Sequence, residues 1–181
     1  MALRATVYKC DLTLSDVDRG VYGSFALTLA RHPSETEERL MVRLLAFVLF
    51  ADPLLAFGRG LSTEDEPDLW LRDATGNIAL WIEVGLPDER DLRKACGRAR
   101  QVVVLAYGSR KAQAWWTAGA QALARLPNLR VLALDDDACA GLQGLAARSM
   151  ALTATVHDGH LWLGSPAASI ELVPRQWLPA A

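Results

Sequence analysis

The stretch EPDLWLRDATGNIALWIEVG, residues 66–85, predicts the β-hairpin on which the fold depends. Two segments rich in aromatic and aliphatic residues flank a polar stretch, in which Thr75 and Gly76 are suited to a tight turn. Counting outward from these two residues fixes the predicted register of the two strands. The expected cross-strand pairs are Asp73–Ile78, Leu71–Leu80, Trp70–Trp81, Leu69–Ile82 and Asp68–Glu83.

The predicted hairpin has one apolar face and one face that carries two acids. Side chains alternate between the faces of a strand, so the apolar face contains Leu69, Leu71, Leu80 and Ile82. On the other face Asp68 and Glu83 would have Cβ atoms about 5 Å apart, which is unfavourable for like charges. A divalent cation between the carboxylates removes this repulsion, and oxygen ligands suit Mg²⁺. The alternative without a metal site is that both acids lie at solvated strand ends.

The pattern therefore predicts a Mg²⁺ site, which Mn²⁺ could also occupy, at Asp68 and Glu83. It also predicts the effect of removing one charge in the metal-free protein. Asp68→Asn removes a like-charge contact, so we expect it to leave stability unchanged or slightly increased.

The remaining periodicities indicate an α/β fold. Ser34 and Glu37 fit a capping box at the start of a helix that ends near Phe50. From residue 34 the expected order is helix, three strands, helix, strand, helix, strand, helix, and the first three strands can pair as an antiparallel meander. The fourth strand follows a helical crossover and can run parallel to the third.

The predicted strands are 55–61, 66–72, 78–84, 101–107 and 129–134. One later helix is predicted to begin after Asp88, and two more are predicted to span 111–125 and 136–148. Further hairpins are predicted at residues 2–30 and around Asp158-Gly159.

Composition describes one ordinary globular domain, residues 1–181. The chain has 51% hydrophobic and 22% charged residues, with a formal net charge of −2, so the protein as a whole does not attract nucleic acid or anionic membrane. No apolar run is long enough to span a bilayer, and the N-terminus does not resemble a signal peptide. The three cysteines, Cys10, Cys96 and Cys139, are widely spaced, which favours free thiols. We expect a cytoplasmic protein with no membrane partner.

Several motifs resemble known families. Pro67-Asp68 followed by Glu83 at the end of the next strand resembles the PD-(D/E)xK nuclease superfamily, whose core has the same order of elements. More narrowly, TLARHPSETEERLMVRLLAF, GLSTEDEPDLW and GLPDERDLRKACGRARQVVV resemble the YaeQ family, over nearly the whole chain. The YaeQ family is described as a variant of the PD-(D/E)xK fold. The resemblance therefore implies a restriction-endonuclease-like mixed sheet flanked by helices, with additional N-terminal and C-terminal β-hairpins.

The chain departs from the superfamily pattern at one position. The lysine that the pattern places two residues after the second acid is replaced by Gly85, which has no side chain. Some superfamily members carry a displaced lysine on the following helix, and Lys94 is the candidate here; the alternative is a solvated basic helix face. Many members add an acid from the first helix, and Glu38 is the candidate here, against an ordinary helix N-terminal acid.

Two hypotheses about function follow. The first is a metal-dependent nuclease-like enzyme in which Asp68 and Glu83 hold Mg²⁺, Glu38 completes the cation shell through water, and Lys94 stabilises developing negative charge. The second is a non-catalytic nucleic-acid- or protein-binding module with the same fold, which Gly85 favours. Nucleic acid is the partner that the first hypothesis requires; the sequence gives no oligomeric state.

Overall fold

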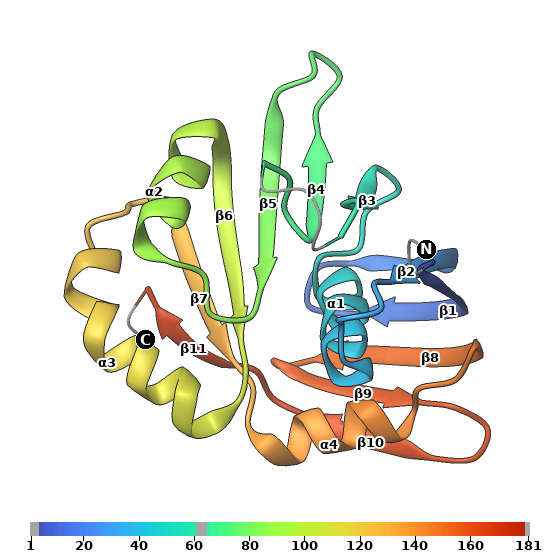
Figure 1. The fold of residues 1–181 in the computed structure, drawn as a ribbon. Coiled ribbons are helices and arrows are strands. Elements are labelled where there is room, and N and C mark those ends of the chain that lie inside the picture. Colours follow the sequence, from blue (N-terminus) through green and yellow to red (C-terminus); the bar gives the residue numbers. More distant parts are fainter. Residues whose placement is uncertain (1–3, 61–64, 180–181) are drawn as a thin grey trace.

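The computed structural model describes residues 4–60 and 65–179, which form two mixed β-sheets and four helices (Figure 1). Helix α1 (Glu37–Phe50) packs against both sheets and contributes to one large core with them. Helices α2 (Glu89–Arg98) and α3 (Ser109–Leu123) cover the other face of the second sheet, where a smaller core lies. Helix α4 (Asp136–Gly144) lies beside α1 and the first sheet. No helix in the described ranges has the length and apolar character needed to cross a membrane.

The first sheet joins the two ends of the chain. Its strand order is β10-β9-β8-β1-β2, and the predicted N-terminal and C-terminal hairpins are both present. Parallel pairing of β1 with β8 merges them into one sheet, which the sequence did not predict. The strands are β1 (Thr6–Asp16), β2 (Val21–Arg31), β8 (Ser149–His157), β9 (His160–Gly164) and β10 (Ser169–Leu172).

The second sheet has the order β11-β7-β6-β5-β4-β3 and contains the hairpin of residues 66–85. The antiparallel meander and the parallel step from its third to its fourth strand are confirmed. Strand β3 is shorter than predicted, and residue 61, its predicted end, lies outside the described residues; β10 and β11 were not predicted. The strands are β3 (Leu55–Phe57), β4 (Leu69–Arg72), β5 (Ile78–Val84), β6 (Ala99–Ala106), β7 (Leu129–Ala133) and β11 (Arg175–Leu178).

The predicted register of the β4–β5 hairpin is confirmed beside the site and wrong beside the turn. The confirmed pairs are Leu69–Ile82, Trp70–Trp81 and Leu71–Leu80. Arg72, instead of Asp73, pairs with Ile78, so Ala79 forms a bulge. The Asp73 carboxylate accepts hydrogen bonds from the backbone N–H groups of Thr75 and Asn77, which gives a longer loop than a two-residue turn.

Helix α1 begins later than predicted. Thr36 is its N-cap, and the Thr36 hydroxyl accepts a hydrogen bond from the backbone N–H of Arg39 at 3.1 Å. The expected Ser34–Glu37 capping box is wrong, because Ser34 bonds to His32 and the Glu37 carboxylate accepts from the hydroxyl of Tyr8.

Nine consecutive residues of α1, numbers 40–48, are buried, because the helix is enclosed by the two sheets and α4. One of these residues, Arg43, is charged and only 1% exposed. Its guanidinium donates to both carboxylate oxygens of Glu35, each at 2.8 Å, and to the carbonyl of Ala30 at 2.9 Å. This buried ion pair therefore attaches the helix to the loop before it and to strand β2.

We expect Arg43→Met to lower the free energy of unfolding by about 3 kcal/mol, because it leaves the Glu35 carboxylate buried with part of its charge compensation lost. Chemical denaturation monitored by circular dichroism measures this loss. Arg125→Ala, which removes an exposed arginine, should change stability by less than about 0.5 kcal/mol. Equal stability of the two variants would contradict a structural role for the Arg43 pair.

Candidate functional site

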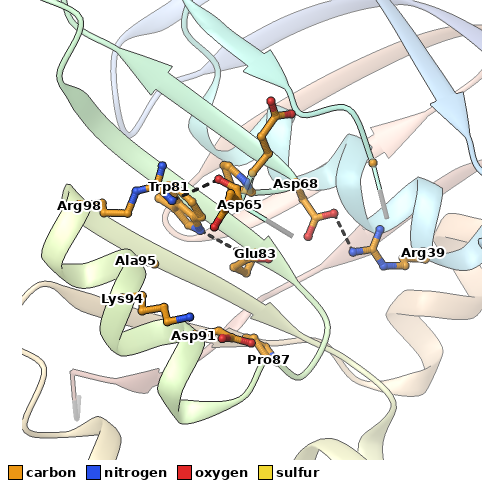
Figure 2. A pocket seen from close by; sticks show the side chains of 13 residues that line it. Arg39, Asp65, Asp68, Trp81, Glu83, Pro87, Asp91, Lys94, Ala95 and Arg98 are labelled. Carbon is orange, nitrogen blue, oxygen red and sulfur yellow. Dashed lines mark hydrogen bonds and ion pairs between the residues drawn. The ribbon is translucent and has the colours of Figure 1, made fainter. Parts of the chain in front are cut away.

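The acids of the β4–β5 hairpin line a pocket of about 220 Å³ between the end of the second sheet and helix α2 (Figure 2). Asp68 precedes β4, Glu83 lies near the end of β5, and Lys94 points toward the same pocket from α2. The structure thus brings these three sequence-predicted residues to one place.

Asp68 is held in place by the backbone around it. The carbonyl of Asp68 accepts a hydrogen bond from the N–H of Gly58 at 2.9 Å. A Cβ atom at Gly58 would lie 2.0 Å from the carbonyl oxygen of Pro67, so only glycine permits this approach of the two segments. One carboxylate oxygen of Asp68, Oδ2, accepts from the N–H of Val84 at 2.7 Å, which ties Asp68 to the end of β5.

The other oxygen of Asp68 binds an arginine that the sequence analysis missed. Arg39 of α1 donates from Nη2 to Asp68 Oδ1 at 2.7 Å and from Nη1 to Glu35 Oε1 at 3.0 Å. Glu35 also pairs with Arg43, so two acids and two arginines form one largely buried network in which the opposite charges balance. The spacing Glu35, Arg39, Arg43, four residues at each step, was the available signal.

Glu83 is the acid whose ionisation the site perturbs most. The pKa of Glu83 is raised to about 7, chiefly by burial and then by the negative charge of Asp68 and hydrogen bonding to it, while Trp81 and Arg39 oppose the shift. The indole Nε1 of Trp81 donates to Glu83 Oε1 at 2.7 Å. The like-charge contact expected from the hairpin register thus contributes to a raised pKa, so Glu83 keeps its proton to a higher pH than an ordinary glutamate does.

Gly85 explains why lysine is missing from its usual position. The φ angle of Gly85 is 112°, a conformation that L-residues rarely adopt, so a lysine there would strain the backbone. The N–H of Gly85 still bonds to the carbonyl of Leu105 at 2.9 Å, so the chain turns away from the sheet directly after this bond. Helix α2, which follows, then supplies Lys94 to the pocket.

Glu38 lies apart from this pocket, whose lining within the described ranges does not include it. Burial is the largest cause of the raised pKa values of Tyr107 and Cys139, and the charge of Glu38 raises both further. The charges of Arg39 and Asp68 also act on Tyr107, so Glu38 shares this neighbour with two residues of the pocket without lining the pocket itself.

Acidic side chains outnumber basic ones in the pocket lining. The acids are Asp65, Glu66, Asp68, Glu83 and Asp91, and the basic residues are Arg39, Lys94 and Arg98. No group of three metal-binding side chains occurs in the part of the chain that the structure describes. Mg²⁺ needs only one or two carboxylates with waters, and each oxygen of Asp68 keeps a lone pair beside its present hydrogen bond. The donor set fits a hard divalent cation.

Comparison with known proteins gives one family. The model of the family described as "YaeQ protein" matches residues 1–174 of the chain. The chain belongs to the YaeQ family. The YaeQ protein of Salmonella typhi is 50% identical and that of Escherichia coli strain K12 is 46% identical, each over 177 residues that cover 98% of both chains. Both relatives are described as uncharacterised.

Two solved structures of the family have the same fold. The crystal structure of the YaeQ protein from Xanthomonas axonopodis pv. citri has a TM-score of 0.93 and 51% identity, and the match covers 96% of this chain and 98% of that one. The YaeQ protein from Pseudomonas syringae has a TM-score of 0.89 and 38% identity, with 96% of both chains covered.

The contacts of Asp68 reverse the effect expected for Asp68→Asn. Both carboxylate oxygens accept from fixed donors, Arg39 and the N–H of Val84, and an asparagine amide has only one oxygen to offer them. We therefore expect Asp68→Asn to destabilise the metal-free protein by about 1–3 kcal/mol. Denaturant unfolding in EDTA measures the change, and a variant as stable as the wild type would contradict the role of these two bonds.

Glu83 should make stability depend on pH. Its pKa rises from 4.5 in the unfolded chain to about 7 in the folded protein, so the folded state binds the proton more tightly. The free energy of unfolding should then fall as the pH rises through this range, by up to about 3 kcal/mol. Glu83→Gln should remove this contribution. Denaturation curves of the wild type and of Glu83→Gln, recorded between these pH values, show whether the pH dependence of stability differs between the two proteins. No difference is expected if Glu83 titrates normally.

Proposed function

We propose that the protein is a divalent-cation-dependent phosphodiesterase of the PD-(D/E)xK type, with nucleic acid as its substrate. The observation that carries the proposal is the convergence of Asp68, Glu83 and Lys94 on one pocket. The strand order around the β4–β5 hairpin also supports a restriction-endonuclease-like core.

In this proposal Asp68 and Glu83 hold Mg²⁺ or Mn²⁺. The ion would supply an acidified bound water as nucleophile and polarise the phosphoryl group. Arg39 and the N–H of Val84 keep the Asp68 carboxylate in a fixed orientation. Glu83 would have to release the proton that it binds near pH 7 before it can ligate the cation.

In this proposal Lys94 supplies the positive charge that the lysine missing at Gly85 would otherwise supply. Its ammonium is a compact charge on a flexible stem, suited to stabilising negative charge that develops on a phosphoryl oxygen. Among the described residues that line the pocket, α1 contributes Arg39 and not Glu38, so in this proposal Glu38 would act only through water in the cation shell.

A second candidate is a non-catalytic module with the same fold that binds nucleic acid or protein. The positive φ of Gly85 favours it, because the backbone excludes lysine from the position where the superfamily pattern has it. The two candidates share the cation site and differ in whether Lys94 assists bond cleavage.

We expect Lys94→Ala to keep the fold and the metal binding but to lower nucleic-acid cleavage by about 10² to 10³, the usual loss for one preorganised charge stabiliser. Gel assays on DNA and RNA, single-stranded and duplex, with Mg²⁺ or Mn²⁺, measure this. Lys111→Ala, which removes an exposed lysine of α3, is the matched control and should cleave normally.

Metal binding is measured separately by thermal unfolding. Mg²⁺ or Mn²⁺ should raise the melting temperature of the wild type and of Lys94→Ala, and not that of Asp68→Asn. Full cleavage by Lys94→Ala would remove Lys94 from the mechanism. A protein that binds the cation and cuts none of the substrates would establish the non-catalytic candidate instead.

A further inference from the structure

Two arginines and two tryptophans form a continuous row of contacts, here called the stack, along the β4–β5 hairpin and the end of helix α2. The guanidinium of Arg72 lies 4.1 Å from the ring centroid of Trp70, and that of Arg98 lies 4.9 Å from the ring centroid of Trp81. The two indole rings contact each other edge to face, with centroids 6.2 Å apart. The order along this stack is therefore Arg72, Trp70, Trp81, Arg98.

The ends of the stack are exposed cations held in place by neutral groups. Arg72 donates to the carbonyl of Gly76 at 3.1 Å, and Arg98 donates to the carbonyl of Asp65 at 3.2 Å. Among the described residues, neither guanidinium forms an ion pair with a carboxylate, whereas nearby Arg93 and Arg100 do. Arg72 and Arg98 thus keep their full charge for a ligand while their side chains are already ordered.

The position of the stack relates it to the pocket. Arg98 lines the pocket that holds Asp68 and Glu83, and Arg72 lies farther along the hairpin, which projects from the body of the protein (Figures 1 and 2). The pocket lining has five acidic and three basic residues, so the pocket itself offers a polyanion no excess of positive charge unless a cation is bound. A substrate with many phosphates therefore needs attachment points besides the bound cation.

We infer that Arg98 and Arg72 bind phosphates of a nucleic-acid backbone that runs from the pocket along the hairpin. The inference rests on the proposed function for its choice of ligand, but it concerns binding and not cleavage. A guanidinium recognises phosphate through paired N–H donors, and stacking on tryptophan reduces the side-chain entropy lost when the phosphate binds. The proposed contacts are to phosphates, so they position the backbone and do not read the bases.

The test measures binding of short labelled DNA and RNA oligonucleotides, single-stranded and duplex, by fluorescence anisotropy with Ca²⁺ at several salt concentrations. The double variant Arg72→Ala/Arg98→Ala should weaken binding of the oligonucleotide that the wild type binds most tightly by at least about tenfold. The slope of log affinity against log salt concentration should fall by the amount expected for about two lost phosphate contacts. Trp70→Leu keeps both charges but removes the platform under Arg72. It should weaken binding by about two- to fivefold, the equivalent of one exposed cation–π contact.

The matched control is Arg110→Ala/Arg125→Ala, which removes the same charge from exposed positions at the two ends of α3. It should leave the affinity within about twofold, since only contacts at the phosphate-binding positions lower the salt slope. Equal weakening of binding by both double variants would show a general charge effect and overturn the inference. A wild type that binds none of the oligonucleotides, or that binds only acidic proteins, would also overturn it.

Failure of the inference and failure of the proposed function give different results. A wild type that binds oligonucleotides through Arg72 and Arg98 but cleaves none of them contradicts the proposed enzymatic activity and supports the proposed phosphate-binding role of the two arginines. A wild type that cleaves oligonucleotides, together with unchanged binding by Arg72→Ala/Arg98→Ala, supports the proposed enzymatic activity and overturns the phosphate-binding role of the two arginines.

Discussion

The guanidinium of Arg39 joins the interior of the molecule to its pocket. One of its nitrogens binds Glu35 and the other binds Asp68, and Glu35 is in turn bound by Arg43 inside the buried helix. Taking these charges from water is costly, and the network is tolerable because each charge has an opposite partner in hydrogen-bonding distance. The orientation of Asp68 is therefore set by α1, a helix enclosed on its sides by the two sheets and α4, and not by a mobile surface side chain.

This arrangement changes how the two acids share their charge. Asp68 has an arginine and a backbone N–H as partners, whereas Glu83 has a tryptophan and the negative field of Asp68. Burial and the negative charge of Asp68 raise the pKa of Glu83, so Glu83 can hold a proton near neutral pH when no cation is bound. A cation entering the pocket would have to displace that proton, so metal affinity should be coupled to pH through Glu83.

The sequence predicted the part of the fold that depends on short-range patterns. The alternation of leucine and isoleucine with other residues set the register of Leu69 to Leu71 against β5, because a slip of one residue would expose the whole apolar face. It failed at the turn, where the side chain of Asp73 forms bonds that alternation does not report. The first sheet was not predicted as a unit, since pairing of β1 with β8 joins distant segments.

The candidate site was predictable to a similar extent. Asp68 and Glu83 follow from the hairpin, and Lys94 follows from family resemblance together with the empty position at Gly85. Glu35 and Arg39 were missed because Glu35 lies outside the helix, so its pairing depends on how the chain enters α1 and not on helical spacing alone.

The parallel pairing of β1 with β8 has a consequence for the order in which the protein can assemble during synthesis. The ribosome releases β1 and β2 early, but the strand that completes their sheet begins only at Ser149. Until then one edge of β1 remains unpaired, and the sheet that packs against α1 consists of β1 and β2 alone. A nascent chain interrupted before this point would expose an open strand edge, so β8 must have been synthesised before the first sheet can be completed around α1.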